Sequence, residues 1–180
     1  ERCHELVSAN FLAESPLIGT AAFSDCTSLS EVGLPSRLAL VAYRTFAGCV
    51  ALKEIIVPGS VLDIGGSAFQ NCGLRKARIL GTYNIGLSAF ADNPELSEVE
   101  LPPNLSSVFD YAFDGCPLTR IEFPSKLISI GTHAFNTYSG IDLSLNTLKF
   151  IRFYGRAPDL GVDPFGLKIN PKCIVFVGYQ

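Results

Sequence analysis

Cysteine is the residue type in this chain with the widest range of possible chemistry, from disulfide bonds to metal ligation. Five of the six cysteines occupy one position of a repeating pattern, namely Cys3, Cys26, Cys49, Cys72 and Cys116. In a repeating coil, that pattern places one thiol per turn along a straight column, whereas zinc requires four ligands that converge on one point. A thiol in a packed interior behaves as a small apolar side chain. We therefore expect buried free thiols, with neither a metal site nor a cofactor.

Histidine is the other residue type that commonly performs catalysis, and the chain has only His4 and His133. Nucleophilic catalysis needs a base, a nucleophile and an orienting group held together. Neither histidine has a Ser, Cys or carboxylate partner that the repeat geometry would bring to it. We expect both histidines to lie at the surface, and we expect the protein not to be an enzyme.

A repeat accounts for the cysteine pattern, and phenylalanine marks it most clearly. Ala-Phe or Thr-Phe pairs recur every 21–23 residues, and a weaker copy follows, so that the column contains Phe23, Phe46, Phe69, Phe90, Phe113, Phe135 and Phe165. A single coil of this length cannot bury its own apolar side, so neighbouring coils must stack. The phenylalanine and cysteine columns are then expected to form one continuous core.

Each repeat also contains a short segment with the periodicity of a β-strand. Its last two apolar residues are two positions apart, as in Ile55 and Val57, which places them on the same face of a strand. Proline follows in several copies, where its missing N–H ends the ladder of hydrogen bonds. We expect one short strand per repeat, ending before Pro35, Pro58, Pro102 and Pro124.

These residues resemble the BspA-like leucine-rich repeats, and among them the 23-residue type of treponemal proteins. Residues 52–74 show the pattern best, through Leu52, Ile55, Val57, Pro58, Val61, Ile64, Gly65, Ala68, Phe69 and Cys72. The resemblance implies an α/β-type solenoid, a right-handed leucine-rich-repeat coil with one short parallel strand in each repeat of about 23 residues. It also implies a bacterial or protist protein that acts in adhesion in an extracytoplasmic place, at the cell surface, secreted or periplasmic.

The pattern covers nearly the whole chain, so we expect residues 1–180 to form a single domain of about seven repeats. Residues 139–147 interrupt the pattern as an insertion, and residues 154–180 form an irregular last coil that we interpret as a cap. Smaller departures are a leucine at the proline position and two substitutions in the cysteine column, at Leu80, Asn93 and Tyr138.

The outward positions of the strands form two columns that are candidates for an interaction face. Opposite charges alternate along them, which permits pairing between neighbouring strands. Two interpretations remain open, a self-neutralised solvated ladder and a mixed-charge recognition surface with Ile56 and Phe150 as apolar anchors. The candidate residues are Glu31, Glu54, Ile56, Lys76, Arg78, Glu98, Glu100, Arg120, Glu122, Phe150 and Arg152.

Composition limits the partners. The formal net charge is −3 and the basic residues are scattered, so a nucleic acid is not expected. No apolar run approaches the roughly 18–20 residues of a transmembrane helix. The chain begins at Glu1 and lacks methionine, which is consistent with a mature form whose leader was removed.

We therefore expect a non-enzymatic protein–protein interaction module, an adhesin or a scaffold, whose partner is a host or envelope protein. One alternative is a structural protein that self-assembles into a homo-oligomer. Its contact would be an uncapped first repeat, in which Leu6, Ala9 and Phe11 occupy core columns. A second alternative is a binder of small hydrophobic ligands that uses the insertion and the last coil.

Overall fold

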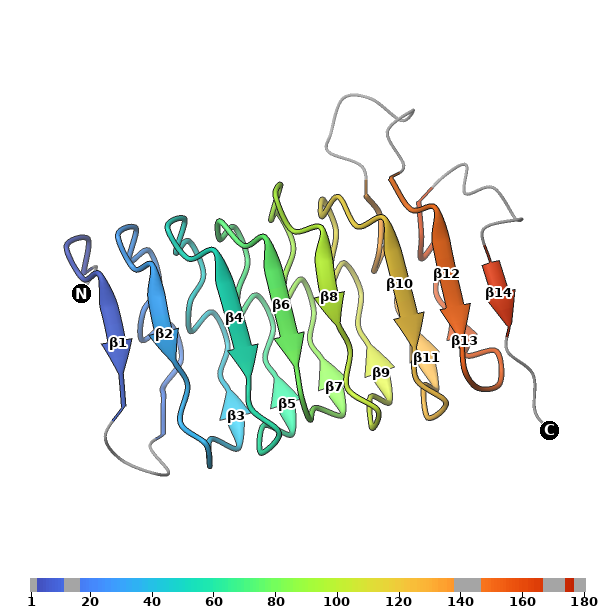
Figure 1. Ribbon diagram of the computed structural model, residues 1–180, viewed down its shortest axis with the longest axis horizontal. Helices are drawn as coiled ribbons and strands as arrows, with labels where there is room; N and C mark the ends of the chain where they lie inside the picture. Colours follow the sequence, from blue (N-terminus) through green and yellow to red (C-terminus); the bar gives the residue numbers. More distant parts are fainter. Residues whose placement is uncertain (1–2, 12–16, 138–146, 167–173, 177–180) are drawn as a thin grey trace.

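The computed structural model describes residues 3–11, 17–137, 147–166 and 174–176. These segments form a stack of coils that advances from one end of an elongated molecule to the other (Figure 1). Each coil contributes a strand to one long face, and most coils contribute a second, shorter strand to the opposite face. All the strand pairs are parallel, as stacking of successive coils requires.

The longer strands form the surface that we call the strand face, which lies toward the viewer in Figure 1. Its members are β1 (Ser8–Asn10), β2 (Glu31–Gly33), β4 (Glu54–Val57), β6 (Lys76–Ile79), β8 (Glu98–Glu100), β10 (Arg120–Phe123), β12 (Phe150–Phe153) and β14 (Ile174–Phe176). Side chains alternate between core and solvent along the strands from β1 to β12. In β4, for example, Ile55 and Val57 are buried whereas Glu54 and Ile56 are exposed.

The opposite side is a continuous sheet of two-residue strands, which we call the back sheet. In spatial order it contains β3 (Leu40–Val41), β5 (Asp63–Ile64), β7 (Asn84–Ile85), β9 (Ser107–Val108), β11 (Ser129–Ile130) and β13 (Asp159–Leu160). Coils approach closely here. Gly86 follows β7, and a Cβ at this position would lie only 2.7 Å from the carbonyl oxygen of Ile64 in the preceding coil. This close approach accounts for the glycine.

The back sheet corrects two expectations. The described residues contain no helix, so the α/β character of the solenoid is not confirmed, and most coils have two strands instead of one. The physical reason lies in the connecting segments. A proline follows several of the longer strands and a glycine follows several of the shorter ones, and both residues oppose helix formation, whereas β-branched residues such as Ile64 and Val108 favour strands between them.

The core is a continuous stack of phenylalanine rings, as the repeat predicts. Consecutive rings from Phe23 to Phe135 lie 5.0–5.4 Å apart between centroids and are nearly parallel. Phe165 continues the stack with a centroid distance of 5.9 Å from Phe135. All except Phe23 are buried. Offset stacking of this kind contributes about 0.5–1.5 kcal/mol per pair beyond the burial of apolar area.

The cysteine column lies inside the stack, and the prediction of buried free thiols is confirmed for four members. Cys26, Cys49, Cys72 and Cys116 are buried and free. The Cys116 thiol donates to the carbonyl oxygen of Phe90 in the preceding coil at 3.1 Å, and two other thiols repeat this contact. Cys3 is exposed, so the expectation was wrong for the first member. Tyr138 and Cys173 lie outside the described residues.

The strand face is not one sheet. It consists of a pair β1–β2, a triplet β4–β6–β8 and a second triplet β10–β12–β14. We call the two interruptions seams, one between β2 and β4 and the other between β8 and β10. The sequence predicted one short parallel strand in each repeat, and at the seams neighbouring strands of this face are not paired with each other.

Two features coincide at both seams. First, the later strand is followed by Pro58 or Pro124, which has no N–H to donate to the previous coil, whereas Leu80 donates to Val57 at 3.0 Å and closes a ladder of four residues. Second, glutamates occupy equivalent outward positions on the two strands that meet, and like charges at neighbouring positions destabilise pairing. These pairs are Glu31 with Glu54, and Glu100 with Glu122.

The junction between β6 and β8 has only the first feature. Pro102 follows β8, yet the two strands remain paired over three residues. Here the outward neighbours have opposite charge, and Lys76 contacts Glu98 at 2.8 Å. We conclude that proline shortens the ladder and that the additional glutamate pair opens it.

Candidate interaction surface

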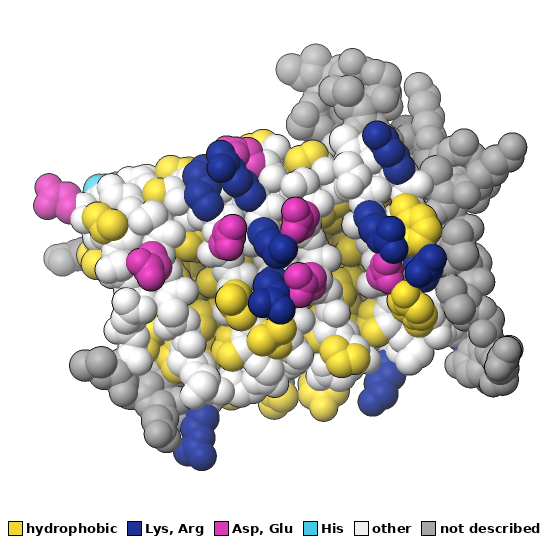
Figure 2. All heavy atoms as spheres, viewed as in Figure 1, with side chains coloured by type: hydrophobic (Ala, Val, Ile, Leu, Met, Phe, Trp, Pro, Cys, Tyr) yellow, Lys and Arg dark blue, Asp and Glu magenta, His cyan; other side chains and the backbone are white. Residues whose placement is uncertain are grey.

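The predicted outward columns do lie on the strand face. Register pairs Glu54 with Lys76 and Lys76 with Glu98 in one column, and Ile56 with Arg78 and Arg78 with Glu100 in the other. Figure 2 shows acidic and basic side chains interspersed over the central strands, and basic and hydrophobic side chains together toward the C-terminal end. The mixed character that the sequence predicted is therefore present.

Only part of the predicted charge ladder forms. Lys76 Nζ lies 2.8 Å from Glu98 Oε2, and Arg78 Nε lies 2.9 Å from Glu100 Oε2. These contacts raise the pKa of Lys76 and of Arg78 through hydrogen bonds to the glutamates. The expected pairing of Glu98 with Arg120 is absent among the described contacts, because the seam separates their strands and Arg120 turns to Glu122 on its own strand.

An aromatic residue and two arginines form a cluster on β10 and β12. The guanidinium carbon of Arg120 lies 4.2 Å from the ring centroid of Phe150, and that of Arg152 lies 4.9 Å from the same centroid. Cation–π contacts at exposed sites each contribute about 0.5–1 kcal/mol. We call this group, together with Glu122 and Tyr154, the arginine–aromatic cluster. The cluster therefore places the apolar ring of Phe150 next to guanidinium N–H donors that are already oriented by their contacts.

Glu122 and Tyr154 hold the cluster together. The Tyr154 hydroxyl donates to Glu122 at 2.6 Å, and the Arg120 Nε donates to the same carboxylate at 2.9 Å. These hydrogen bonds, with that from Tyr154 first, lower the pKa of Glu122, so its carboxylate stays charged at neutral pH. Arg152 donates to the Tyr154 hydroxyl at 3.2 Å. The sequence analysis did not identify Tyr154 as part of the interaction face. Its position could have indicated this, because Tyr154 lies two residues after Arg152 and four after Phe150, on the same outward side.

A groove accompanies each seam. The groove between β2 and β4, which we call the N-terminal groove, has a volume of about 820 Å³, and its lining includes Val32, Leu34, Ile56 and Leu80. The groove between β8 and β10 is smaller, about 510 Å³. Because the ladder is open at the seams, core-column residues such as Val32 and Leu34 are only partly buried there. The grooves therefore have apolar floors.

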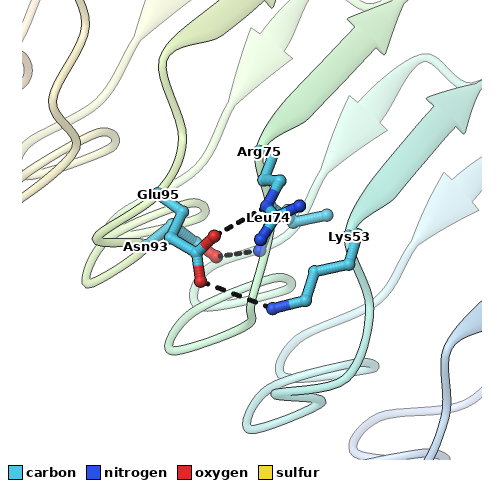
Figure 3. A network of polar contacts seen from close by, with 5 residues as sticks. All are labelled: Lys53, Leu74, Arg75, Asn93 and Glu95. Atoms are coloured by element: carbon cyan, nitrogen blue, oxygen red, sulfur yellow. Dashed lines mark hydrogen bonds and ion pairs between the residues drawn. The ribbon is translucent and has the colours of Figure 1, made fainter.

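A polar network ties three coils together beside the strand face (Figure 3). Glu95 accepts from Arg75 at 2.6 Å and contacts Lys53 at 3.5 Å, two coils before its own. The Arg75 contact is the main cause of the lowered pKa of Glu95. Nearby, Asn93 Oδ1 accepts from the backbone N–H of Leu74 at 3.3 Å. The network holds Lys53, the one lysine that lines the N-terminal groove, toward Glu95.

The remaining candidate residues have other environments. Leu6, Ala9 and Phe11 are partly buried against the core, and Phe11 packs edge-on against Phe23 at 6.0 Å. Their role in joining copies of the chain stays a prediction. His4 is exposed, as expected, whereas His133 is half-buried beside the ring of Tyr111, which corrects its surface assignment.

The described segments contain no cluster of three or more His, Cys, Asp or Glu side chains that could hold a metal ion. None of their elements is a helix with the length and apolarity needed to cross a membrane. Most of the insertion at 139–147, which the hydrophobic-ligand alternative invoked, lies outside them.

Comparison with known proteins gives matches over most of the chain. A family model described as the BspA type leucine rich repeat region matches residues 16–142 in six copies. A leucine rich cell surface protein from Faecalibacterium prausnitzii, of known crystal structure, is 28% identical with a TM-score of 0.66, over 84% of this chain and 40% of that one. No curated protein matches the sequence significantly.

A second solved structure has the same fold. A leucine-rich repeat protein from Bacteroides ovatus is 18% identical with a TM-score of 0.50, and the match covers 97% of this chain and 56% of that one. The chain thus spans about half of the length of these two solved proteins.

Proposed function

Because the chain belongs to the BspA-type leucine-rich repeat family, we propose that it is a non-enzymatic protein-binding module, an adhesin or a scaffold, exposed outside the cytoplasm of a bacterium. Its likeness to a leucine rich cell surface protein supports the location. The partner that we propose is a protein of a host or of the cell envelope, bound on the strand face.

The arginine–aromatic cluster is the observation that carries this proposal. Binding energy in protein interfaces concentrates in a few residues, and arginine and tyrosine are prominent among them. Here two guanidinium groups lie against the ring of Phe150, and Tyr154 is 46% exposed beside them. Since these side chains already contact one another, little conformational entropy is lost when a partner binds.

The test measures binding of purified host matrix and envelope proteins to the immobilised chain by biolayer interferometry. We expect Phe150→Ser and Arg120→Glu each to weaken binding of the captured partner about tenfold or more, because both remove a central contact of the cluster. Ile128→Ser is the matched control, since Ile128 is 61% exposed beside the back sheet. Binding that survives both cluster variants but is lost with Ile128→Ser would assign the interface to the back sheet instead.

A further inference from the structure

The N-terminal groove differs from the other seam in its electrostatics. At the seam between β8 and β10, each glutamate of the rim has a cationic partner: Glu98 contacts Lys76, Glu100 contacts Arg78 and Glu122 contacts Arg120. At the N-terminal groove, Glu31 and Glu54 are both exposed and have no ion pair or hydrogen bond from their side chains among the described residues. Lys53 is held by Glu95.

The two unpaired carboxylates make the electrostatic potential at this rim negative, which favours the binding of a cation. They occupy equivalent outward positions on β2 and β4 and line the same groove. A positive side chain between them would form two favourable contacts and relieve the repulsion that keeps the strands apart. Within the β4–β6–β8 triplet, Lys76 gives the pattern of such a contact by lying 2.8 Å from Glu98 and 3.8 Å from Glu100.

The backbone at this seam is also incompletely paired. Among the described strands, β2 pairs only with β1 and β4 only with β6. The facing edges of these two strands therefore lack a hydrogen-bonded ladder, although their Cα atoms lie within 8 Å of each other in places, which leaves no room for a further strand between them. A peptide would instead lie over the groove, where the glutamates of the rim supply charge selectivity.

The apolar floor of the groove would select aliphatic side chains in the bound peptide. Val32 and Leu34 belong to the core columns but are only partly buried, and Ile56 is 52% exposed beside them. In an extended peptide that lies along the groove, alternate side chains point inward and outward. The inward ones would contact Val32 and Leu34, and the outward ones would lie beside the glutamates.

We propose that the N-terminal groove binds an extended peptide segment in which lysine or arginine alternates with aliphatic residues. This inference rests on the protein-binding function proposed above and names the class of segment that one part of the strand face recognises. The site is separate from the arginine–aromatic cluster, which lies on β10 and β12 at the other end of the face.

The probe is a short, fluorescently labelled, end-capped peptide of alternating valine and lysine, and its counterpart has glutamate in place of lysine. We expect anisotropy to show saturable binding of the lysine peptide only, weakened by salt because the attraction is between charges near the surface. Glu31→Gln and Glu54→Gln should each weaken binding about tenfold. Asp159→Asn, an equal charge change on the back sheet, should leave binding unchanged.

Hydrogen exchange locates the bound peptide. Protection should rise at residues 31–33 and 54–57 and stay unchanged at residues 98–100, since a peptide bound over the groove shields the backbone of β2 and β4 from water. Equal affinity for both peptides, or protection confined to β8, overturns the inference. Calcium binding that requires Glu31 and Glu54 without any peptide binding also overturns it, because the carboxylates would then serve a metal ion.

The outcome is distinguishable from that of the proposed function. Phe150→Ser should leave binding of the lysine peptide intact while it removes binding of the protein partner. If the protein partner binds in a Phe150-dependent manner and the peptide does not bind, the groove assignment fails and the proposed function stands. If the peptide binds and no protein partner does, the groove assignment stands and the proposed function fails.

Discussion

The side-chain amide of Asn93 donates a hydrogen bond to the backbone carbonyl oxygen of Phe69 at 2.9 Å. Cys72 makes the equivalent contact one coil earlier, where its thiol donates to the carbonyl oxygen of Phe46 at 3.1 Å. The cysteine column is therefore defined by a task that a thiol or an amide can perform, which is to satisfy a buried carbonyl of the preceding coil. This accounts for the column without any redox or metal chemistry.

Asn93→Ala should be strongly destabilising. The Asn93 amide also donates to Phe90 at 2.7 Å and accepts from Leu74, so its removal takes away a partner of the Phe69 carbonyl and of the Leu74 N–H, whereas the Phe90 carbonyl keeps the Cys116 thiol. We expect the free energy of unfolding to fall by about 2–3 kcal/mol. Urea denaturation measures the change. Asn93→Cys should recover part of the loss because a thiol can donate to Phe69, and an alanine variant as stable as the unmodified chain would contradict this role.

Thiol reactivity should follow burial. Maleimide labelling of the folded protein, mapped by mass spectrometry of peptides, is expected to modify Cys3 rapidly and Cys72 and Cys116 only after denaturation, because only Cys3 is exposed among these. Rapid labelling of Cys116 in the folded state would show that the coils separate frequently.

Alkaline pH should destabilise the fold through the same thiols. Burial raises the pKa of Cys49 from 9.0 to about 12, and burial also raises the pKa of Cys72 and Cys116. Above about pH 9 the unfolded chain loses these protons while the folded chain keeps them, so stability falls as pH rises from about 9 toward 12. Each thiol contributes a slope of up to about 1.4 kcal/mol per pH unit. Cys49→Ala should decline less steeply than the unmodified chain between about pH 8 and about pH 10.

Phe69→Ala tests the phenylalanine stack. Its ring is fully buried between those of Phe46 and Phe90. Truncation removes both ring contacts and leaves a cavity in the middle of the solenoid, at an expected cost of about 3–5 kcal/mol. Tyr43→Ala is a suitable control because Tyr43 is 53% exposed. Equal urea midpoints for the two variants would contradict the importance of the stack.

The coil interior could be predicted from sequence because its constraints recur. Phe46, Phe69 and Phe90 each stack between two other phenylalanine rings. The same packing requirement therefore recurs in every coil and is visible in the sequence as a column of one residue type. The outward strand positions were predicted for the same reason, since alternation about buried residues such as Ile55 and Ile121 sets which side chains face solvent.

The organisation of the strand face required the structure. Whether Arg120 pairs with Glu98 or Glu122 depends on the spacing between coils, and that spacing depends on hydrogen bonds that differ from coil to coil. Sequence does contain the two contributing signals, the proline after β10 and the neighbouring Glu100 and Glu122. The proline and the glutamate pair together open the ladder at the seams and not at the junctions between them. A repeat pattern, which averages over all the coils, does not show such a difference between junctions.

The origin of the seams can be tested by exchanging residues between coils. Leu80 donates its N–H to Val57 at 3.0 Å and thereby closes the ladder between β4 and β6. Leu80→Pro removes this donor, and we expect faster hydrogen exchange at residues 76–79 with a loss of about 1–3 kcal/mol in the free energy of unfolding. Outward neighbours here are Glu54 with Lys76, which have opposite charge, so the ladder should shorten without opening.

The reciprocal change should close a seam. Pro58→Leu supplies an N–H toward the preceding coil, and Glu31→Lys replaces the repulsion with Glu54 by attraction while Glu54 keeps its neighbour Lys76 of opposite charge. Glu31→Lys alone should allow β2 and β4 to pair over about three residues, as β6 and β8 do beside Pro102, whereas Pro58→Leu alone should slow exchange at residues 54–57 only slightly. The double variant should slow exchange markedly and shift the urea midpoint upward. Exchange at residues 54–57 that stays fast in Glu31→Lys would contradict the role of the glutamate pair, and a double variant no better protected than Glu31→Lys alone would contradict the role of proline.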